Sequence, residues 1–165
     1  MNELDAIQAS LASFTKRLDE VSTDRFNELR KCSFFDPIPS EWLRPVAEQA
    51  EIRIFSAGDC VTAEGDDMNT FFVFLFGTAT VYHNKKVVGT IRSGECIGEG
   101  MFFANENLSR SATVIADNQV IAAEFKRTGV DLLRGESKAY LDKALLLALF
   151  KKLQGANRKI EELMR

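Results

Sequence analysis

Two residues of opposite charge, Glu99 and Arg110, lie near each other in the sequence among glycines and small residues. The glycines Gly98 and Gly100 let the backbone come close to a ligand, because they carry no Cβ to obstruct it. The Arg110 guanidinium can hold a phosphate through two parallel charge-assisted hydrogen bonds. The Glu99 carboxylate only accepts hydrogen bonds, so it suits a sugar hydroxyl and repels a bare phosphate. Together these groups predict a site for a small cyclic phosphodiester that carries a ribose.

The residues around the two charges favour a ligand site over a structural ion pair. Residues 101–105, which begin with Met101, are compatible with a short helix, and N–H groups at the start of a helix are ready anion donors. A buried pair of Glu99 with Arg110 is the structural alternative, but desolvation removes much of its Coulomb gain. That alternative also leaves the glycines and the small residues Ser111 and Ala112 without a purpose. We therefore interpret the segment as a binding site.

The segment resembles the phosphate-binding cassette of cyclic nucleotide-binding domains, which occur in bacterial cyclic-AMP receptor proteins, protein kinase A regulatory subunits and cyclic-nucleotide-gated channels. The family pattern of Gly-Glu, a short helix and Pro-Arg-x-Ala-Thr matches here as Gly98-Glu99 and Arg110-Ser111-Ala112-Thr113. Turn motifs at 55–59, 64–66 and 76–77 have the family's spacing, and the resemblance extends over residues 30–163. Two features depart from the pattern: Ser109 replaces the proline, which removes a φ constraint, and the interval between the charges is longer, with the extra residues at 104–108.

The resemblance implies roles for individual residues. Gly98 and Glu99 would hold the ribose 2′-hydroxyl, while Arg110 and the N–H groups after it would hold the cyclic phosphate. The long C-terminal helix would act as a lid over the base. The implied ligand-binding set is Gly98, Glu99, Gly100, Met101, Arg110, Ser111, Ala112, Gln154 and Asn157. The expected ligand is cAMP, with cGMP as the alternative because a hydroxyl at Ser111 can bond the guanine amino group in this family.

Composition limits the class of protein. The 165-residue chain is 45% hydrophobic and 27% charged, which is typical of one globular domain with a helical appendage. Its net charge of −3 gives no reason to expect a nucleic-acid partner. The acidic start does not resemble a signal peptide, and the longest apolar runs, 71–76 and 144–150, are too short to cross a membrane. The 3 cysteines form no CxxC pair, so we expect unpaired thiols in a reducing cytoplasm.

The sequence carries no recognisable catalytic constellation. A metal-dependent enzyme on a jelly-roll scaffold typically needs two or three histidines with a carboxylate. The chain has 1 histidine, His83, next to an expected hairpin turn, where a solvent-exposed position is the simplest interpretation. There is also no phosphate-binding Walker loop and no GxSxG motif. We expect a protein that is not an enzyme and that needs no metal or cofactor besides its nucleotide ligand.

Short strands with frequent turn residues predict a mainly β fold with flanking helices. The candidate strands are 52–55, 59–62, 71–76, 78–83, 86–91, 96–97, 111–116 and 119–125. Hairpin turns are expected at Asn84-Lys85 and at Asp117-Asn118. Eight such strands favour a jelly-roll-like barrel. The expected organisation is an N-terminal helical segment at 1–31, a cyclic nucleotide-binding barrel at 32–135 and a C-terminal lid and dimerisation helix at 136–165.

Both ends of the chain show a helical period of apolar residues. The first seam comprises Leu4, Ile7, Leu11, Phe14, Leu18 and Val21, and the second comprises Leu146, Leu149, Leu153, Ala156, Ile160 and Leu163. Such narrow stripes are typical of coiled coils, so we expect a homodimer. The C-terminal period continues to the end of the sequence, which favours an output domain or partner protein that receives the signal. The alternative function is a structural coiled-coil dimerisation module with a degenerate pocket that binds nothing.

Overall fold

The computed structural model describes residues 5, 8–9, 12–13, 24–102 and 108–165. The side chains of the expected N-terminal seam, from Leu4 to Val21, lie outside these residues. Most of the lengthened stretch at 104–108 lies outside them as well. The division of the chain into three segments therefore stays a prediction, and the fold below is that of the described part.

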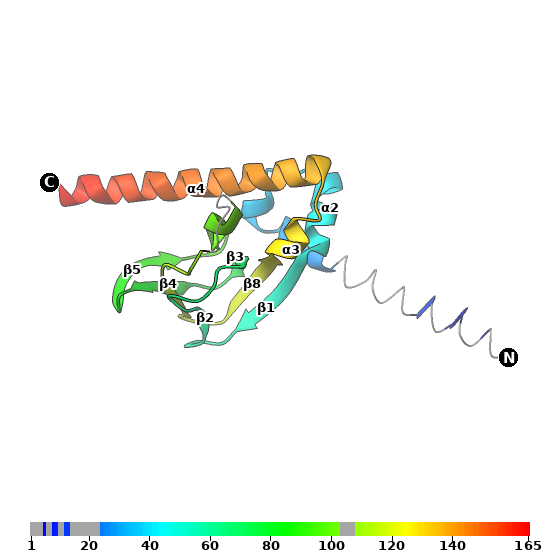
Figure 1. The fold of residues 1–165 in the computed structure, drawn as a ribbon, viewed down its shortest axis with the longest axis horizontal. Helices are drawn as coiled ribbons and strands as arrows, with labels where there is room; N and C mark the ends of the chain where they lie inside the picture. The colour runs from blue at the N-terminus through cyan, green and yellow to red at the C-terminus, as the bar shows by residue number, and fades with distance from the viewer. Residues whose placement is uncertain (1–4, 6–7, 10–11, 14–23, 103–107) are drawn as a thin grey trace.

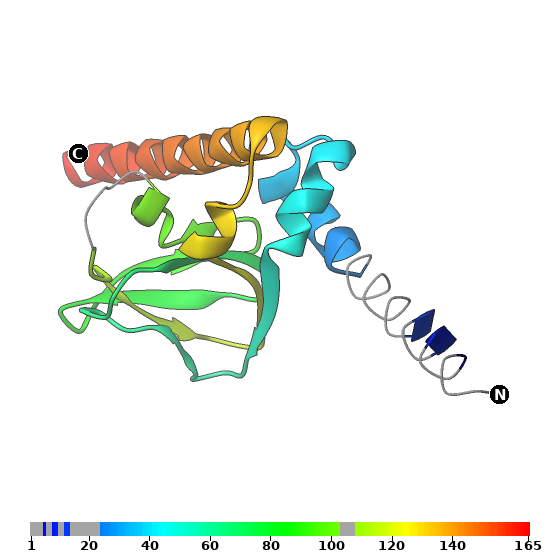
Figure 2. The ribbon, with the colours of Figure 1, turned by 45° about the vertical axis from the view of Figure 1, so that its right-hand side comes forward.

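The chain folds into two four-stranded antiparallel sheets that face each other (Figure 2). The first sheet has the order β1 (Ala50–Phe55), β8 (Val120–Lys126), β3 (Thr70–Phe76) and β6 (Cys96–Ile97). The second has the order β2 (Cys60–Thr62), β7 (Thr113–Ala116), β4 (Ala79–His83) and β5 (Lys86–Ile91). Each expected strand is present, so the jelly-roll-like fold with flanking helices is confirmed. The sheets form a sandwich rather than a closed barrel.

One of the two expected hairpins forms and the other does not. Asn84 and Lys85 both have positive φ, 49° and 64°, and join the paired strands β4 and β5 as a two-residue turn. Asp117-Asn118 instead links β7 to β8, which lie in different sheets. The hairpin prediction there was wrong because this turn is bonded to the start of β4. The Thr78 carbonyl accepts from the Asp117 N–H at 2.9 Å, and the Thr78 N–H donates to Asn118 Oδ1 at 2.9 Å.

Strand β3 is buried on both faces and separates two apolar cores. Phe71 and Val73 belong to the core shared with the helices, where the ring of Phe71 stacks on that of Phe125 with centroids 4.7 Å apart. Phe72 and Phe74 belong to the core between the two sheets. The alternation follows from the strand geometry, because successive side chains point to opposite faces. The first sheet is therefore packed on both sides, by helices and by the second sheet.

The helices pack on the outer face of the first sheet (Figures 1 and 2). They are the helical residues 24–30, η1 (Ser33–Phe35), α2 (Ser40–Glu48), η2 (Glu99–Phe102), α3 (Arg127–Val130) and α4 (Gly135–Leu163). The N-terminal half of α4 buries Leu141 and Leu145 in the helix-side core. From 153 onward every residue of α4 is exposed, and in Figure 1 the end of the helix projects past β5. Among the described residues, no helix has the length and apolar character needed to cross a membrane.

Candidate functional site

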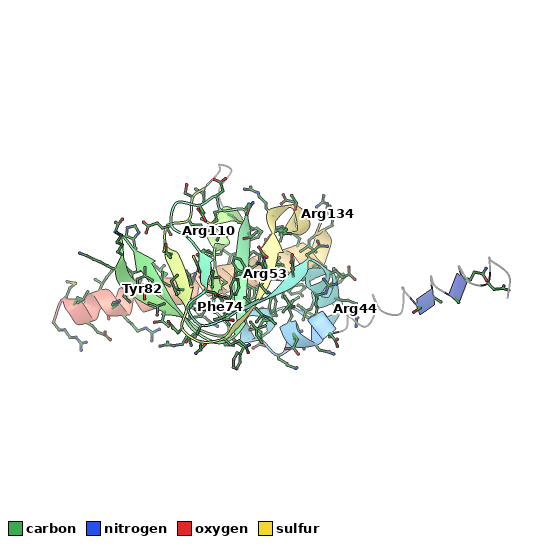
Figure 3. All side chains as sticks on the ribbon, turned by 90° about the horizontal axis from the view of Figure 1, so that it is seen from below. Arg44, Arg53, Phe74, Tyr82, Arg110 and Arg134 are labelled. Atoms are coloured by element: carbon green, nitrogen blue, oxygen red, sulfur yellow. The ribbon has the colours of Figure 1, made fainter. Side chains whose placement is uncertain are left out.

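A cavity of about 200 Å³ opens between the second sheet and the segment that follows β6. The charged and hydroxyl side chains in its lining are those of Thr62, Glu99, Arg110, Ser111 and Lys152, and the small residues are Gly98 and Ala112. The larger apolar residues are Met68, Val81, Ile91, Ile97 and Val114. The structure thus brings together both predicted charges, Gly98 and the two small residues after Arg110. In Figure 3, Arg110 lies between Tyr82 of β4 at one end of the sandwich and Arg44 of α2 on the helical side.

Arg110 is buried and is held through one end of its guanidinium. Its Nη2 donates to the Thr70 carbonyl oxygen at 2.8 Å and to Thr70 Oγ1 at 2.9 Å, and its Cζ lies 5.9 Å from the centroid of the Phe72 ring. Desolvation lowers the pKa of the Arg110 guanidinium, and the nearby Glu124, Asp66 and Glu99 carboxylates offset part of that change. An arginine nevertheless keeps its proton in proteins. The site therefore presents a fixed, partly desolvated cation.

Backbone pairing positions the main chain of Arg110. Its N–H donates to the Asp66 carbonyl at 2.7 Å, and its own carbonyl accepts from the Gly65 N–H at 2.9 Å. The Met68 N–H donates to the Leu108 carbonyl at 2.8 Å, which extends the same pairing. This short ladder of 65–68 with 108–110 fixes the backbone at Ser109, where the family pattern has a proline.

His83 forms a hydrogen bond to the backbone of Ser111, the residue after Arg110. As expected it is exposed, but it is not an idle surface side chain: its Nδ1–H donates to the Ser111 carbonyl at 2.8 Å and lies 3.1 Å from Glu64 Oε1. The amide of Asn84 donates to the other ring nitrogen, Nε2, at 3.1 Å. A histidine at the end of β4 thereby fixes the backbone that lines the cavity.

Gly98 is required by its neighbours as much as by any ligand. Its φ is +82°, a region that side chains with a Cβ rarely adopt, and a Cβ there would overlap Arg110 Nη1 and lie 2.7 Å from the Thr70 carbonyl oxygen. We expected Gly98 to admit a ligand. In the structure its missing side chain makes room for the arginine, so the glycine and Arg110 form one packed unit.

Glu99 is 8% exposed and pairs with a residue that the sequence did not single out. Lys152 of α4 contacts Glu99 Oε1 with its Nζ, and the same ammonium donates to the Cys96 carbonyl at 2.5 Å. A pair of lysines such as Lys151-Lys152 would ordinarily indicate a solvated helix face, but Lys152 is half-buried against Glu99. The signal was present in the helical spacing, because Lys152 follows the buried Leu141 and Leu145 at steps of four and seven.

The other predicted ligand-binding residues do not line this cavity. Met101 is 1% exposed and belongs to the helix-side core, while among the described residues a Cβ on Gly100 would have Leu108 Cδ1 as its nearest neighbour, at 3.9 Å. Gln154 and Asn157 are exposed on α4. At about 100° per residue they lie roughly 160° and 140° around the helix from Lys152, so they cannot face the cavity while Lys152 does. Their contact with a base stays a prediction.

The cavity offers hydrogen-bonding groups that no described protein group satisfies. Within 24–102 and 108–165, the N–H groups of Ser111 and Ala112 have no acceptor, and Arg110 Nη1 bonds to no protein atom. In the same part of the chain Glu99 uses Oε1 but not Oε2. Ser111 is exposed, and neither Arg110 Nη1 nor Glu99 Oε2 is among the sealed side-chain atoms that lack a partner in the described residues, so an entering ligand can reach these groups. Three donors and one acceptor around a small space fit an anion that also carries a hydroxyl group.

Other chemistry finds no support in the described part of the chain. No group of three or more His, Cys, Asp or Glu side chains in it could hold a metal ion. Cys96, beside Glu99, is fully buried, and desolvation raises the pKa of its thiol to about 12. A thiol that keeps its proton at neutral pH is a poor nucleophile. The groups that line the cavity are those that bind an anion.

Comparisons with known proteins agree with this chemistry. Residues 52–134 match the family model described as "Cyclic nucleotide-binding domain". The chain is 26% identical over 134 residues to a cGMP-dependent protein kinase of Plasmodium berghei, a match that covers 79% of this chain and 15% of the kinase. The chain thus spans only a small part of that relative.

Solved structures share the fold. A cyclic nucleotide-binding domain from Methylobacillus flagellatus superposes with a TM-score of 0.71 at 18% identity, over 87% of this chain and 84% of that one. The structure described as "cAMP bound PfPKA-R (141-441)" superposes with a TM-score of 0.68 at 20% identity, over 89% of this chain and 49% of that one. At these identities the likeness concerns the fold alone.

Proposed function

The chain belongs to the cyclic nucleotide-binding domain family, and from that premise we propose that it is a regulatory sensor that binds cAMP in the cavity between Glu99 and Arg110. The arrangement around Arg110 carries this proposal. One guanidinium nitrogen and the N–H groups of Ser111 and Ala112 are available for a cyclic phosphate, while Glu99 Oε2 is available for a ribose hydroxyl. Charge-assisted hydrogen bonds of this kind contribute about 1.5–3 kcal/mol each.

The choice of cAMP over cGMP is the finer part of the proposal. A solved relative is described as bound to cAMP, whereas the kinase relative is described as cGMP-dependent. Ser111 lines the cavity and has a hydroxyl that suits either base. The titration described below decides between the two nucleotides by the ratio of their affinities.

Helix α4 is the element that we propose transmits binding to an output domain or partner protein. It touches the cavity through Lys152 and then continues as an exposed helix to Leu163. Contact of Gln154 or Asn157 with the base requires this helix to turn, because both residues now face away from the cavity. Ligand that favours the docked position, in which Lys152 contacts Glu99, would shift the population of helix orientations toward that position.

We further propose that the exposed end of α4 pairs with a second copy of the chain. Leu146, Phe150, Leu153, Ile160 and Met164 are between 55% and 82% exposed and recur in heptad register, with Asn157 completing the series. This seam differs from the expected one at every second position, where 150, 157 and 164 replace 149, 156 and 163. Leu149 does not belong to it because its side chain is half-buried. A single asparagine in such a seam fixes register and favours dimers at some cost in stability.

The three cysteines support a cytoplasmic location for this sensor. All of them, Cys32, Cys60 and Cys96, are free thiols in the structure. Unpaired cysteines are typical of proteins kept in a reducing compartment.

Isothermal titration with cAMP and with cGMP tests the proposed function, using protein first checked for co-purified nucleotide. We expect binding by the wild type and none detectable for Arg110→Ala, because a buried anion left without its partner costs at least about 2–5 kcal/mol. The matched control is Arg92→Ala, which removes an exposed arginine outside the cavity and should leave binding unchanged. A folded, nucleotide-free wild type that binds neither nucleotide would favour the alternative, a dimerisation module with a degenerate pocket.

A further inference from the structure

Lys152 is the place where α4 meets the cavity. It is half-buried, and every residue of the helix after it is exposed. Its side chain crosses from the helix to the segment 96–99, which runs from β6 to the start of η2, where its Nζ contacts Glu99 Oε1 and bonds to the Cys96 carbonyl at 2.5 Å. Two acceptors on that segment thus fix one ammonium on α4.

The pairing addresses an electrostatic conflict within the site. Glu99 is 8% exposed and would carry a negative charge beside the space proposed for a cyclic phosphate. A buried carboxylate without a partner is unfavourable, and it would also repel the ligand's own charge. Lys152 places a positive charge on the carboxylate from the side of the helix, so the net charge of the pair next to the ligand is close to zero.

One oxygen of the Glu99 carboxylate remains available to accept a hydrogen bond from a ligand. Lys152 occupies Oε1, and in the described part of the chain Oε2 has no hydrogen-bond partner. A carboxylate whose one oxygen is anchored has a fixed orientation about its last torsion angle. Its second oxygen is then presented to the cavity without the entropy cost of ordering it when ligand arrives.

We propose that Lys152 is a positioning residue for nucleotide binding: it anchors Glu99 Oε1 so that Oε2 is presented to the ribose 2′-hydroxyl. This inference rests on the proposed function of the site. It assigns Lys152 a role that acts through Glu99 rather than by contact with the ligand. It also makes the docking of α4 and the binding of ligand mutually dependent, since the same ammonium belongs to both.

An inhibitory role for Lys152 predicts the opposite change in ligand affinity when the lysine is removed. If the ammonium had to leave Glu99 before a hydroxyl could reach the carboxylate, Lys152 would compete with the ligand. Removing it would then tighten binding. A positioning role predicts weaker binding instead.

The test is a titration of wild type, Lys152→Met and Lys152→Arg with cAMP and with 2′-deoxy-cAMP, or with the corresponding guanine pair if the wild type prefers cGMP. Methionine keeps the length of the side chain and removes its charge, whereas arginine keeps the charge. The matched control is Lys151→Met, which removes the neighbouring exposed lysine. Thermal unfolding of each variant verifies that it is folded.

We expect Lys152→Met to weaken cAMP binding about tenfold, the loss of one charge-assisted contact. The same change should weaken binding of 2′-deoxy-cAMP at least threefold less, because that ligand lacks the hydroxyl that Glu99 accepts from. Lys152→Arg should restore most of the affinity, and Lys151→Met should match the wild type. A merely structural role would lower both affinities equally.

Two results would overturn the positioning role while leaving the proposed function intact. One is an equal penalty for both ligands, and the other is tighter cAMP binding by Lys152→Met. A folded wild type that binds neither nucleotide would instead refute the proposed function, and the role of Lys152 with it.

Discussion

Replacing Gly98 by alanine tests the claim that this glycine and Arg110 form one packed unit. The residue has a φ of +82°, and an added Cβ would overlap Arg110 Nη1 and lie 2.7 Å from the Thr70 carbonyl oxygen. A left-handed backbone costs a residue with a Cβ about 1–2 kcal/mol. The Thr70 oxygen belongs to strand β3 and cannot move aside, so Arg110 must shift and weaken its bonds to Thr70.

A substitution at a second glycine with a similar φ separates the free-energy cost of displacing Arg110 from the cost of the left-handed backbone. Gly58 has a similar φ of +87°, but an added Cβ there meets nothing within 4 Å. Gly58→Ala should therefore lose only the backbone part, about 1–2 kcal/mol. Gly98→Ala should lose roughly 2.5–5 kcal/mol, because the disturbed arginine adds about 1.5–3 kcal/mol to the backbone cost.

Denaturant unfolding followed by the fluorescence of Trp42, the single tryptophan, measures the two free energies of unfolding. Nucleotide titration of the same proteins measures the effect on the site. We expect Gly98→Ala to bind at least about tenfold more weakly than the wild type, whereas Gly58→Ala should bind as the wild type does. Equal unfolding free energies and equal affinities for the two variants would refute the packed unit of Gly98 with Arg110.

Three further outcomes follow from the structure. Thr70→Val removes the Oγ1 acceptor of Arg110 Nη2 but keeps the carbonyl, so calorimetry should show about fivefold weaker nucleotide binding; unchanged affinity would mean that the hydroxyl does not position the arginine. Asn157→Leu should strengthen self-association and admit assemblies larger than a dimer in light scattering; a monomer in both proteins would contradict the α4 seam. In the folded protein, a thiol reagent at mildly alkaline pH should label the exposed Cys60 first. Cys96, which is buried with a pKa of about 12, should react only after denaturation, and labelling of both at one rate would contradict the packing around β6.

The ends of several strands could be predicted closely because turn residues with positive φ lie next to them. Gly58, Gly77 and Gly94 all have positive φ, and each lies where the sequence pattern ended or began a strand. Alternating burial in β3 was less visible, since both faces of Thr70–Phe76 are apolar. The assignment of strands to two sheets was beyond local patterns, and Asp117-Asn118 was misinterpreted for that reason.

Some residues of the candidate site could likewise be predicted from local sequence, and others could not. Glu99 and Arg110 could be found because they lie in one continuous segment, and their chemistry can be argued from residue type alone. Lys152 pairs with Glu99 across 53 positions, and that contact depends on how α4 is rotated about its axis. The placement of Gln154 and Asn157 failed to match the cavity for the same reason. Local sequence predicts a helix well, but the face that a helix presents to the core is decided by tertiary packing.

The unsupported end of α4 has a mechanical consequence. Beyond Lys152, residues 153–163 form an exposed rod about 16 Å long, at about 1.5 Å per residue. If Lys152 acts as the pivot, a tilt of about 10° moves the far end by about 3 Å, while atoms within one residue of the pivot move by only about 0.3 Å. The displacement at the far end of the helix is therefore about ten times the displacement next to Lys152. An adjustment at Glu99 too small to disturb the sandwich becomes, at Leu163, a displacement large enough to break or make a helix–helix contact.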